Sequence, residues 1–299
     1  MADLSLFDYD GSIPPALEVV SSQERDTCTR QDVTYDSPSG GRVPAYIVRP
    51  HAGMPFAGAV FVHWGQGDRN EFLEEAIALA PLGLLSLLID APYLRPVEWR
   101  PYRDSPQALR DEDIQLVLDI RRGIDLLVSQ PDVDAGRLAY VGHSLGATRG
   151  GIVTAVEKRI CAYVLMAGSV SQSEMYRTHP HPRLAQAREN TPRSEREAFV
   201  RSIQPLDAIH YIGQSAPAAL FFQYARNDEY ITTEDAARYF TAASHPKHMT
   251  RYDAGHALNA QARVDRAAWL AAQLSLTPLT PDIKDKLLQL PQPEPLQRV

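Results

Sequence analysis

The feature that most constrains the fold is a serine placed between two glycines, directly after an apolar run. Residues 142–146 read GHSLG and follow the run LAYV at 138–141. Glycines two positions before and after a serine let a strand and a helix approach without a Cβ clash. We therefore expect Ser144 on a sharp strand-to-helix turn that exposes its hydroxyl as a nucleophile. A glycine-rich turn with an inert serine is the alternative.

After a serine on such a strand-to-helix turn, an acid and then a histidine base are expected, each on a loop after a later strand. His256 is the last of nine histidines. It lies between residues 247–252, which read as a short strand, and residues 261–274, which read as an amphipathic helix. We predict that His256 is the base, with a packed or surface histidine as the alternative.

The acid should follow another strand between the serine and the histidine. Asp228 comes after residues 218–224, the most strand-like run of the C-terminal half. A buried carboxylate at this position would fix the imidazole tautomer and stabilise the imidazolium. We predict that Asp228 is the acid. Glu229, expected to point away, and Asp253, too close to the base in sequence, are the competitors.

The same site needs backbone donors for an oxyanion. A strand expected over residues 59–63 ends in the sequence HWGQG at 63–67. A helix beginning after the serine would direct its first N–H group at the oxyanion, and a glycine-rich loop can supply a second. We predict the N–H groups of Leu145 and Gly65 as donors, with Trp64 as the alternative to Gly65.

These segments resemble the α/β-hydrolase superfamily, in particular bacterial esterases of the dienelactone-hydrolase-like branch. The resemblance runs from about residue 42 to 274 and rests on residues 63–67, 142–146, 226–229 and 253–256. Trp64 stands where these hydrolases usually have glycine, and Ser144 where dienelactone hydrolases have cysteine. The resemblance implies a mostly parallel central sheet flanked by helices, and hydrolysis of carboxylic esters without a cofactor.

The chain divides into an N-terminal arm, a core, an insertion in the core and a tail. We place them at residues 1–25, at 26–168 with 215–274, at 169–214 and at 275–299. Alternating strands and helices in the core argue for a parallel sheet covered on both faces.

The arm, the insertion and the tail depart from this alternation. The arm reads as irregular, with a weak helical patch around Leu17. In the insertion we expect a loop over 169–182 and then short helices over 183–188 and 194–203, forming a small lid. A surface excursion away from the pocket is the alternative. The proline-rich tail, with a short helix over 282–290, is not expected to add to the core and would pack on the domain or on a second subunit.

Apolar and aromatic residues near the expected mouth of the site favour small or aromatic uncharged esters. The candidates for the substrate pocket are Trp64, His143, Tyr93, Met175 and Tyr176. His143, next to the nucleophile, has the alternative role of shaping the turn.

The composition narrows the partners. A net charge of −7, without a basic run, disfavours nucleic acid and anionic membranes, and no segment approaches the length of an apolar membrane span. Cys28 and Cys161 are expected as free thiols, and the N-terminus lacks the basic start of a signal peptide, so we expect a cytoplasmic protein. His179 and His181 lack further ligands for a metal, and no metal or cofactor is expected. A homodimer is left open.

Three other functions are weighed against an esterase with a small-molecule substrate. A thioesterase would use nearly the same site chemistry. A peptidase of this fold would usually carry a large additional domain, for which 299 residues leave no room. A ligand-binding receptor on a hydrolase scaffold would bind a substrate without being labelled by a covalent serine probe.

Overall fold

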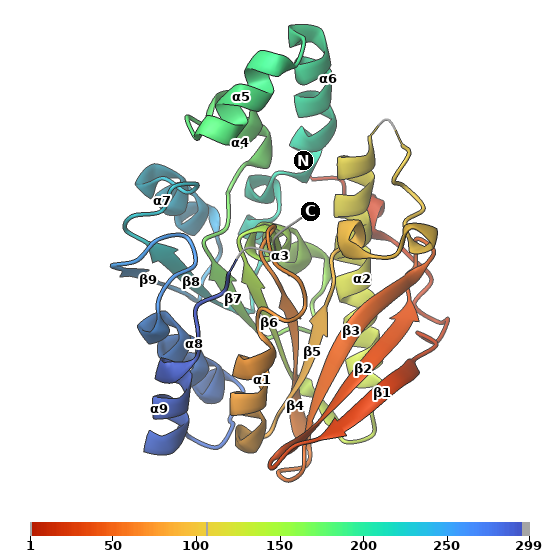
Figure 1. Ribbon diagram of the computed structural model, residues 1–299, viewed down its shortest axis with the longest axis vertical. Helices are drawn as coiled ribbons and strands as arrows, with labels where there is room; N and C mark the ends of the chain where they lie inside the picture. The colour runs from red at the N-terminus through yellow and green to blue at the C-terminus, as the bar shows by residue number, and fades with distance from the viewer. Residues whose placement is uncertain (1, 106, 295–299) are drawn as a thin grey trace.

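A mostly parallel sheet runs through the computed structural model, which describes residues 2–105 and 107–294 (Figure 1). Its strands lie in the order β1-β2-β3-β5-β4-β6-β7-β8-β9. β1 to β3 pair antiparallel, β3 pairs antiparallel with β5, and the remaining pairs are parallel. The bounds are β1 Glu18–Glu24, β2 Cys28–Asp36, β3 Arg42–Pro50, β4 Phe56–Val62, β5 Leu84–Ile89, β6 Val133–His143, β7 Ala162–Met166, β8 Ala219–Ala225 and β9 Lys247–Tyr252.

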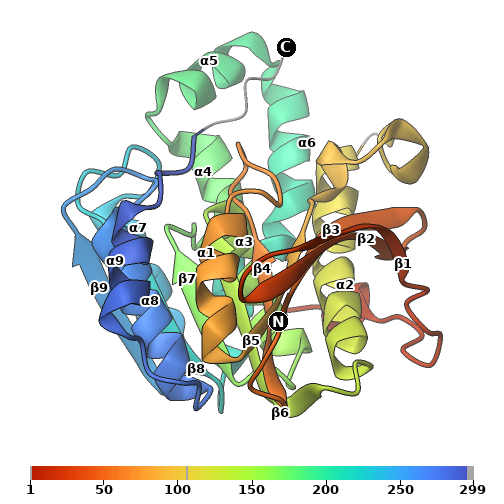
Figure 2. The ribbon, with the colours of Figure 1, turned by 60° about the horizontal axis from the view of Figure 1, so that its bottom comes forward.

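Helices cover both faces of the sheet (Figure 2). One face carries α2 (Ala108–Val128), α3 (Leu145–Val156) and α7 (Thr233–Ala242), and the other carries α1 (Leu73–Leu79), α8 (Ala260–Gln273) and α9 (Pro281–Gln289). Every residue of β4 and β5 is buried, as expected for central parallel strands that pack helices on both sides. The expected α/β architecture is confirmed.

The first strand was not expected. The sequence predicts an irregular arm over residues 1–25, with a helical patch near Leu17, whereas β1 spans Glu18–Glu24 and pairs with β2. Every residue of β1 is exposed because neither face of this edge strand is covered. The strand therefore lacks the alternation of apolar and polar residues by which a half-buried strand is recognised.

The insertion between β7 and β8 is more helical than expected. It contains α4 (Gln172–Thr178), α5 (Pro182–Asn190) and α6 (Arg193–Ile203), which stand apart from the sheet in Figure 1. The sequence predicts α5 and α6 but expects a loop where α4 forms. Ser171 caps α4 by accepting a hydrogen bond from the N–H of Glu174, which stabilises this short helix.

The tail also departs from expectation, because α9 packs against α8 and α1 and adds to the core. Leu287 of α9 is fully buried, and Arg263 of α8 donates to its backbone oxygen at 2.8 Å. The last five residues of the predicted tail, 295–299, lie outside the described residues.

The carboxyl ends of β6, β8 and β9 meet at one edge of the sheet because these strands run parallel. The loops after these strands carry the serine, aspartate and histidine singled out by the sequence. No helix of the described residues has the length and apolar character needed to cross a membrane. Cys28 and Cys161 are both free thiols.

Candidate active site

Ser144 lies on a strained turn between β6 and α3. Its backbone φ is 51° and its ψ is −101°, a conformation that costs about 1–3 kcal/mol and persists only when the surrounding structure imposes it. The flanking glycines permit the turn. A Cβ on Gly142 would lie 2.5 Å from the backbone of Gly146, and a Cβ on Gly146 would overlap the carbonyl oxygen of Val62 in β4. The turn thus lifts the serine hydroxyl clear of the backbone.

The structure brings Ser144, His256 and Asp228 into one hydrogen-bonded chain. Nε2 of His256 lies 2.8 Å from Oγ of Ser144, and Nδ1 lies 2.9 and 3.0 Å from the carboxylate oxygens of Asp228. Since an ionised carboxylate only accepts, Nδ1 donates and Nε2 is left to accept the serine proton. This is the arrangement that a serine nucleophile and its base require.

Asp228 is held by its own loop. One of its oxygens, Oδ1, also accepts the N–H groups of Tyr230 at 2.9 Å and Ile231 at 3.0 Å. Its side chain is 1% exposed, so few water molecules compete for the histidine. The ring of Tyr230 meets the ring of His256 edge to face, with centroids 4.9 Å apart.

The competing carboxylates lie elsewhere. Glu229 is exposed, and Asp253 is exposed and accepts a hydrogen bond from the side chain of Asn227 at 3.0 Å. Neither is placed next to the imidazole of His256.

The loop after β4 lies beside the nucleophile. The N–H of Trp64 donates to the carboxylate of Glu71 at 2.7 Å, so Trp64 is not available as the alternative oxyanion donor. Gly65 lines the cavity next to Ser144, and its carbonyl accepts the hydroxyl of Tyr93 at 3.1 Å. Leu145 opens α3, and its N–H donates no hydrogen bond within the described residues. Leu145 and Gly65 remain the predicted donors.

His63 fixes the shape of this loop. Its Nδ1 lies 2.6 Å from the carbonyl oxygen of Trp64 and must donate, whereas its Nε2 accepts the N–H of Ala91 at 3.1 Å. The ring is therefore neutral and bonded on both sides.

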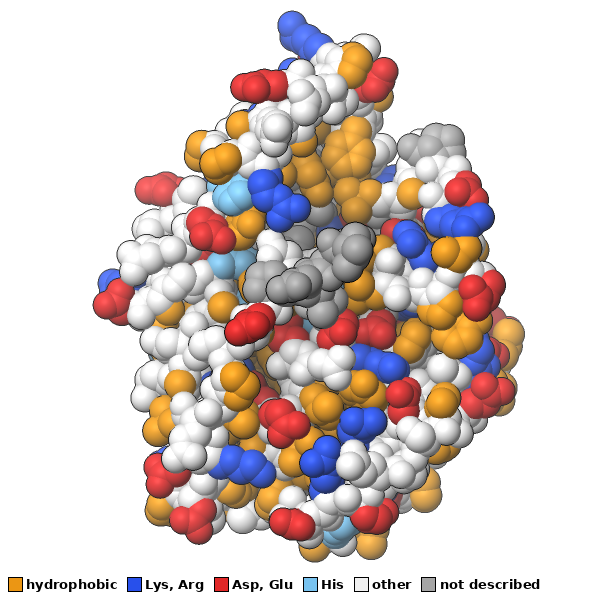
Figure 3. Space-filling view, viewed as in Figure 1, with side chains coloured by type: hydrophobic (Ala, Val, Ile, Leu, Met, Phe, Trp, Pro, Cys, Tyr) orange, Lys and Arg blue, Asp and Glu red, His pale blue; other side chains and the backbone are white. Residues whose placement is uncertain are grey.

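A cavity of about 390 Å³ opens beside Ser144. Four of the five predicted pocket residues line it: Trp64, Tyr93, Met175 and Tyr176. The last two lie on α4, so the insertion contributes a wall of this cavity. In Figure 3 hydrophobic side chains gather where the insertion faces the rest of the molecule.

His143 does not line the cavity, which corrects its place among the pocket residues. It is fully buried behind the turn, where its ring stacks on the indole of Trp64 at 5.3 Å with 9° between the planes. Its Nδ1 lies 2.6 Å from Glu71 and its Nε2 lies 3.0 Å from the backbone oxygen of His256.

One end of the cavity is polar. Arg149 of α3 is fully buried and forms a two-point ion pair with Asp113 of α2, at 2.9 and 2.5 Å. It also reaches the side-chain oxygen of Gln172 in α4. Burial raises the pKa of Asp113 to about 6, against the lowering effect of Arg149. These contacts connect the insertion to the core.

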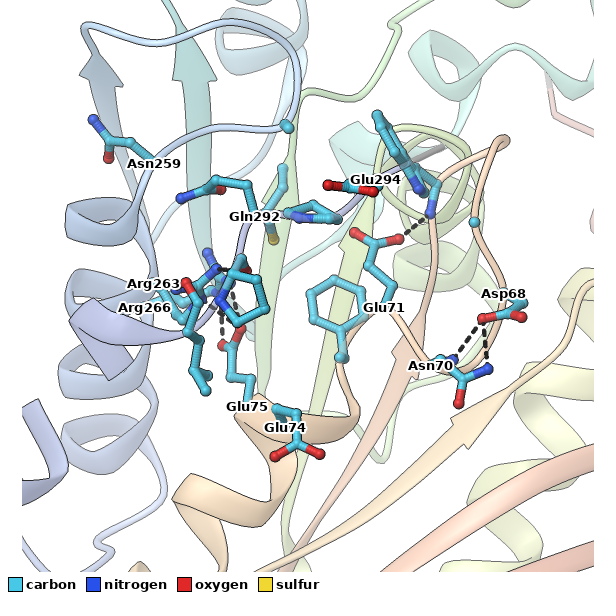
Figure 4. Close-up of a pocket in the computed structure, with 18 residues that line it drawn as sticks. Asp68, Asn70, Glu71, Glu74, Glu75, Asn259, Arg263, Arg266, Gln292 and Glu294 are labelled. Carbon is cyan, nitrogen blue, oxygen red and sulfur yellow. Dashed lines mark hydrogen bonds and ion pairs between the residues drawn. The ribbon is translucent and has the colours of Figure 1, made fainter. Parts of the chain in front are cut away.

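A second cavity, of about 270 Å³, lies between α1, α8 and the chain after α9 (Figure 4). Glu75 of α1 forms an ion pair with Arg266 there, and residues 290–294 close one side. Trp64 lines both cavities and so forms a wall between them.

No cluster of three or more metal-ligating side chains occurs in residues 2–105 and 107–294. Nδ1 of His179 accepts the N–H of His181 at 3.1 Å, so one nitrogen of this pair is used within the loop.

Glu71, Arg149 and Tyr230 are among the residues of the site that were not predicted. Tyr230 lies two positions after Asp228, and that proximity was a usable signal. Arg149 lies five positions after Ser144, where a charged residue among small ones was unusual. Glu71 has no local signal for its contact with His143, which lies 72 positions further along the chain.

Comparisons with known proteins fit this geometry. Residues 109–275 match the model of the prolyl oligopeptidase family, peptidase S9. An uncharacterized protein of Mycobacterium tuberculosis (strain H37Rv) is 32% identical over 177 residues, a match that covers 59% of this chain and 56% of that protein. The chain thus spans about half the length of the curated relatives it matches.

Solved structures agree with the fold. An acetyl xylan esterase from Paenibacillus sp. R4 superimposes with a TM-score of 0.76 at 19% identity, covering 90% of this chain and 92% of that one. Acetyl xylan esterase 1 from Thermoanaerobacterium sp. gives 0.66 at 17% identity, covering 84% and 86%. At these identities the likeness shows the α/β-hydrolase fold alone.

Proposed function

Since the chain belongs to the prolyl oligopeptidase family, we propose that it is a serine hydrolase that cleaves carboxylic esters through an acyl-enzyme. The observation that carries the proposal is the hydrogen-bonded chain from Ser144 through His256 to Asp228, at the wall of a cavity. The names of the structurally similar acetyl xylan esterases support an ester as the substrate.

In the proposed first step, Nε2 of His256 takes the proton of the Ser144 hydroxyl while Oγ attacks the ester carbonyl carbon. Asp228 stabilises the imidazolium that forms. The N–H groups of Leu145 and Gly65 are the proposed donors to the oxyanion, and one such donor contributes about 3–4 kcal/mol to the transition state.

The tetrahedral intermediate then breaks down. The imidazolium of His256 protonates the oxygen of the leaving alcohol, and the acyl group remains on Ser144. A water molecule, deprotonated by His256, attacks this acyl-enzyme through a second tetrahedral intermediate. The acid leaves and the proton returns to Oγ.

The family assignment favours peptide hydrolysis as a second candidate function. Ester and amide cleavage share the triad chemistry, so the geometry of the triad does not separate them. A short-acyl nitrophenyl ester and a peptidyl nitroanilide would do so, if kcat/KM for each is divided by the rate of its uncatalysed hydrolysis, because the ester is the more reactive compound with any nucleophile. We expect the larger rate enhancement for the short-acyl ester, and a larger enhancement for the peptidyl nitroanilide would favour the peptidase.

Ser144→Ala tests the nucleophile directly. We expect kcat to fall to about a thousandth of wild type or less, and covalent labelling by a fluorophosphonate probe to disappear, while the folded state is kept. Wild-type binding of an ester without labelling or turnover would contradict the proposal and favour a receptor.

A further inference from the structure

One buried carboxylate touches the parts of the site that come from different strands. Glu71 lies just before helix α1, and Figure 4 shows its carboxylate beneath the loop after β4. Its side chain is 3% exposed. One oxygen accepts the N–H of Trp64 at 2.7 Å, and the other lies 2.6 Å from Nδ1 of His143. Glu71 thereby connects residues 63–67, which we call the oxyanion loop, to His143, the residue before Ser144.

His143 extends this connection to the base. Its Nε2 lies 3.0 Å from the backbone carbonyl oxygen of His256, which can only accept, so Nε2 must donate. Nδ1 is then either protonated and donating to an ionised Glu71, or accepting from a protonated Glu71. In both cases both ring nitrogens are bonded, and the hydrogen bond from Nε2 of His143 to the backbone of His256 fixes the loop that carries the base.

The aromatic rings of the residues joined by these hydrogen bonds also pack on one another. The indole of Trp64 stacks on His143 and lies within 26° of the plane of His256, with centroids 6.2 Å apart. Gly67 makes room for this indole, since a Cβ there would overlap its edge. A tilt of either histidine would therefore disturb the indole as well as the hydrogen bonds.

We propose that Glu71 and His143 are a positioning pair that holds His256 and the oxyanion loop in register with Ser144. This inference rests on the proposed function and extends it to two residues that touch no substrate. A displacement of about 1 Å at a reacting group can cost about 100-fold in rate. Because the pair contacts both the loop after β4 and the loop that carries His256, it fixes how far each of these loops lies from Ser144.

The substitutions Glu71→Ala and Glu71→Gln separate geometry from charge. Alanine removes both bonds, and we expect kcat to fall by about 10- to 100-fold with little change in KM. Glutamine keeps an oxygen for the N–H of Trp64, and its amide donates to a neutral His143. We expect Glu71→Gln to recover kcat to within about threefold of wild type, with an unchanged pH profile, because the hydrogen bonds are restored.

Glu75→Ala is the matched control. Glu75 lies one helical turn further along the chain, has a side chain that is also 3% exposed, and pairs with Arg266 rather than with the site. Its loss should lower Tm while leaving kcat per active site within about twofold of wild type. A purely structural role for Glu71 would make its alanine variant behave in the same way.

The readouts are kcat, KM, Tm and the second-order rate of Ser144 labelling by a fluorophosphonate, all normalised to titrated active sites. Normalisation removes misfolded protein from the comparison. Labelling reports activation of the serine whatever the natural substrate, so it tests the pair even if every ester in the panel is inert and the proposed function fails. Equal labelling rates for Glu71→Ala and Glu75→Ala would overturn the positioning pair. A Glu71→Gln variant as slow as Glu71→Ala would overturn it also.

Discussion

Replacing Asp228 by asparagine should reverse the histidine tautomer while leaving the loop in place. Oδ1 of Asp228 accepts the N–H groups of Tyr230 and Ile231, so the asparagine must keep its carbonyl oxygen there. Its NH₂ group then takes the position of Oδ2, 3.0 Å from Nδ1 of His256. Because NH₂ donates, it favours an Nδ1 that accepts over the alternative in which Nδ1 keeps its proton and donates only to Oδ1, 2.9 Å away. The ring proton then lies on Nε2, which faces Ser144.

A histidine in this tautomer cannot take the serine proton. We expect Asp228→Asn to lower kcat by about 10⁴-fold, which corresponds to about 5 kcal/mol of lost transition-state stabilisation. Stability should change by less than about 1 kcal/mol, because each hydrogen bond of the carboxylate is replaced. The measurement is kcat for a nitrophenyl ester, with Tm measured beside it to verify that the variant is folded.

Asp253→Asn provides the comparison, since Asp253 is exposed and bonds to Asn227 rather than to the histidine. It should change kcat by less than about threefold. If Asp228→Asn kept more than about a hundredth of wild-type kcat, or if Asp253→Asn were the more damaging change, the assignment of the acid would be refuted.

Three further predictions concern the turn, the cavity and the insertion. Gly146→Ala should destabilise the protein by about 1–3 kcal/mol and lower kcat, because the added Cβ would push α3 away from β4. Gly11→Ala is the control, since a Cβ there would have no described atom within 4 Å, and it should change neither quantity. Urea unfolding measures the stability and an ester assay measures kcat. Alanine at both Met175 and Tyr176 should shift the preferred acyl chain upward across an ester series and leave fluorophosphonate labelling unchanged, since no triad member is touched; an unchanged preference would remove α4 from substrate selection. Burial lowers the pKa of His179 below its ordinary value of 6.5, so the unfolded insertion binds a proton more readily than the folded one. The folded insertion should therefore lose stability as the pH falls below about 6.5. Hydrogen exchange of α4 and α5, corrected for intrinsic rates, should then be faster at about pH 5.5 than at about pH 7.

The core of the fold could be predicted because its strands are buried on both faces and read as apolar runs. Residues 218–224, expected as a strand, correspond to β8, Ala219–Ala225, in which six of the seven residues are buried. β1 could not be predicted in the same way, since an edge strand exposed on both faces is defined by its backbone bonds to β2. The helix of α9 was expected, but its contribution to the core was missed because prolines around it obscured one buried face that includes Leu287.

The triad geometry could be anticipated because each member follows a strand in a fixed chain order. The surroundings of the triad could not. Glu71 lies 72 positions before its partner His143, and nothing in the sequence near either residue signals the contact. Glu71 decides two expectations at once, because one of its oxygens accepts the N–H of Trp64, which is then not available to an oxyanion, and the other bonds to His143 outside the cavity.

The placement of the insertion has a consequence for how such a chain can diversify. The segment leaves the sheet after Met166 and returns at Ala219, on neighbouring strands, while the three triad residues follow β6, β8 and β9. A segment of another length or sequence could thus replace this wall of the cavity without shifting Ser144, Asp228 or His256, the residues of the proposed triad. The partly buried contact between Arg149 of α3 and Gln172 of α4 joins the core to the base of this segment, so a graft should preserve it. Substrate range and bond-breaking chemistry are in this way open to separate variation.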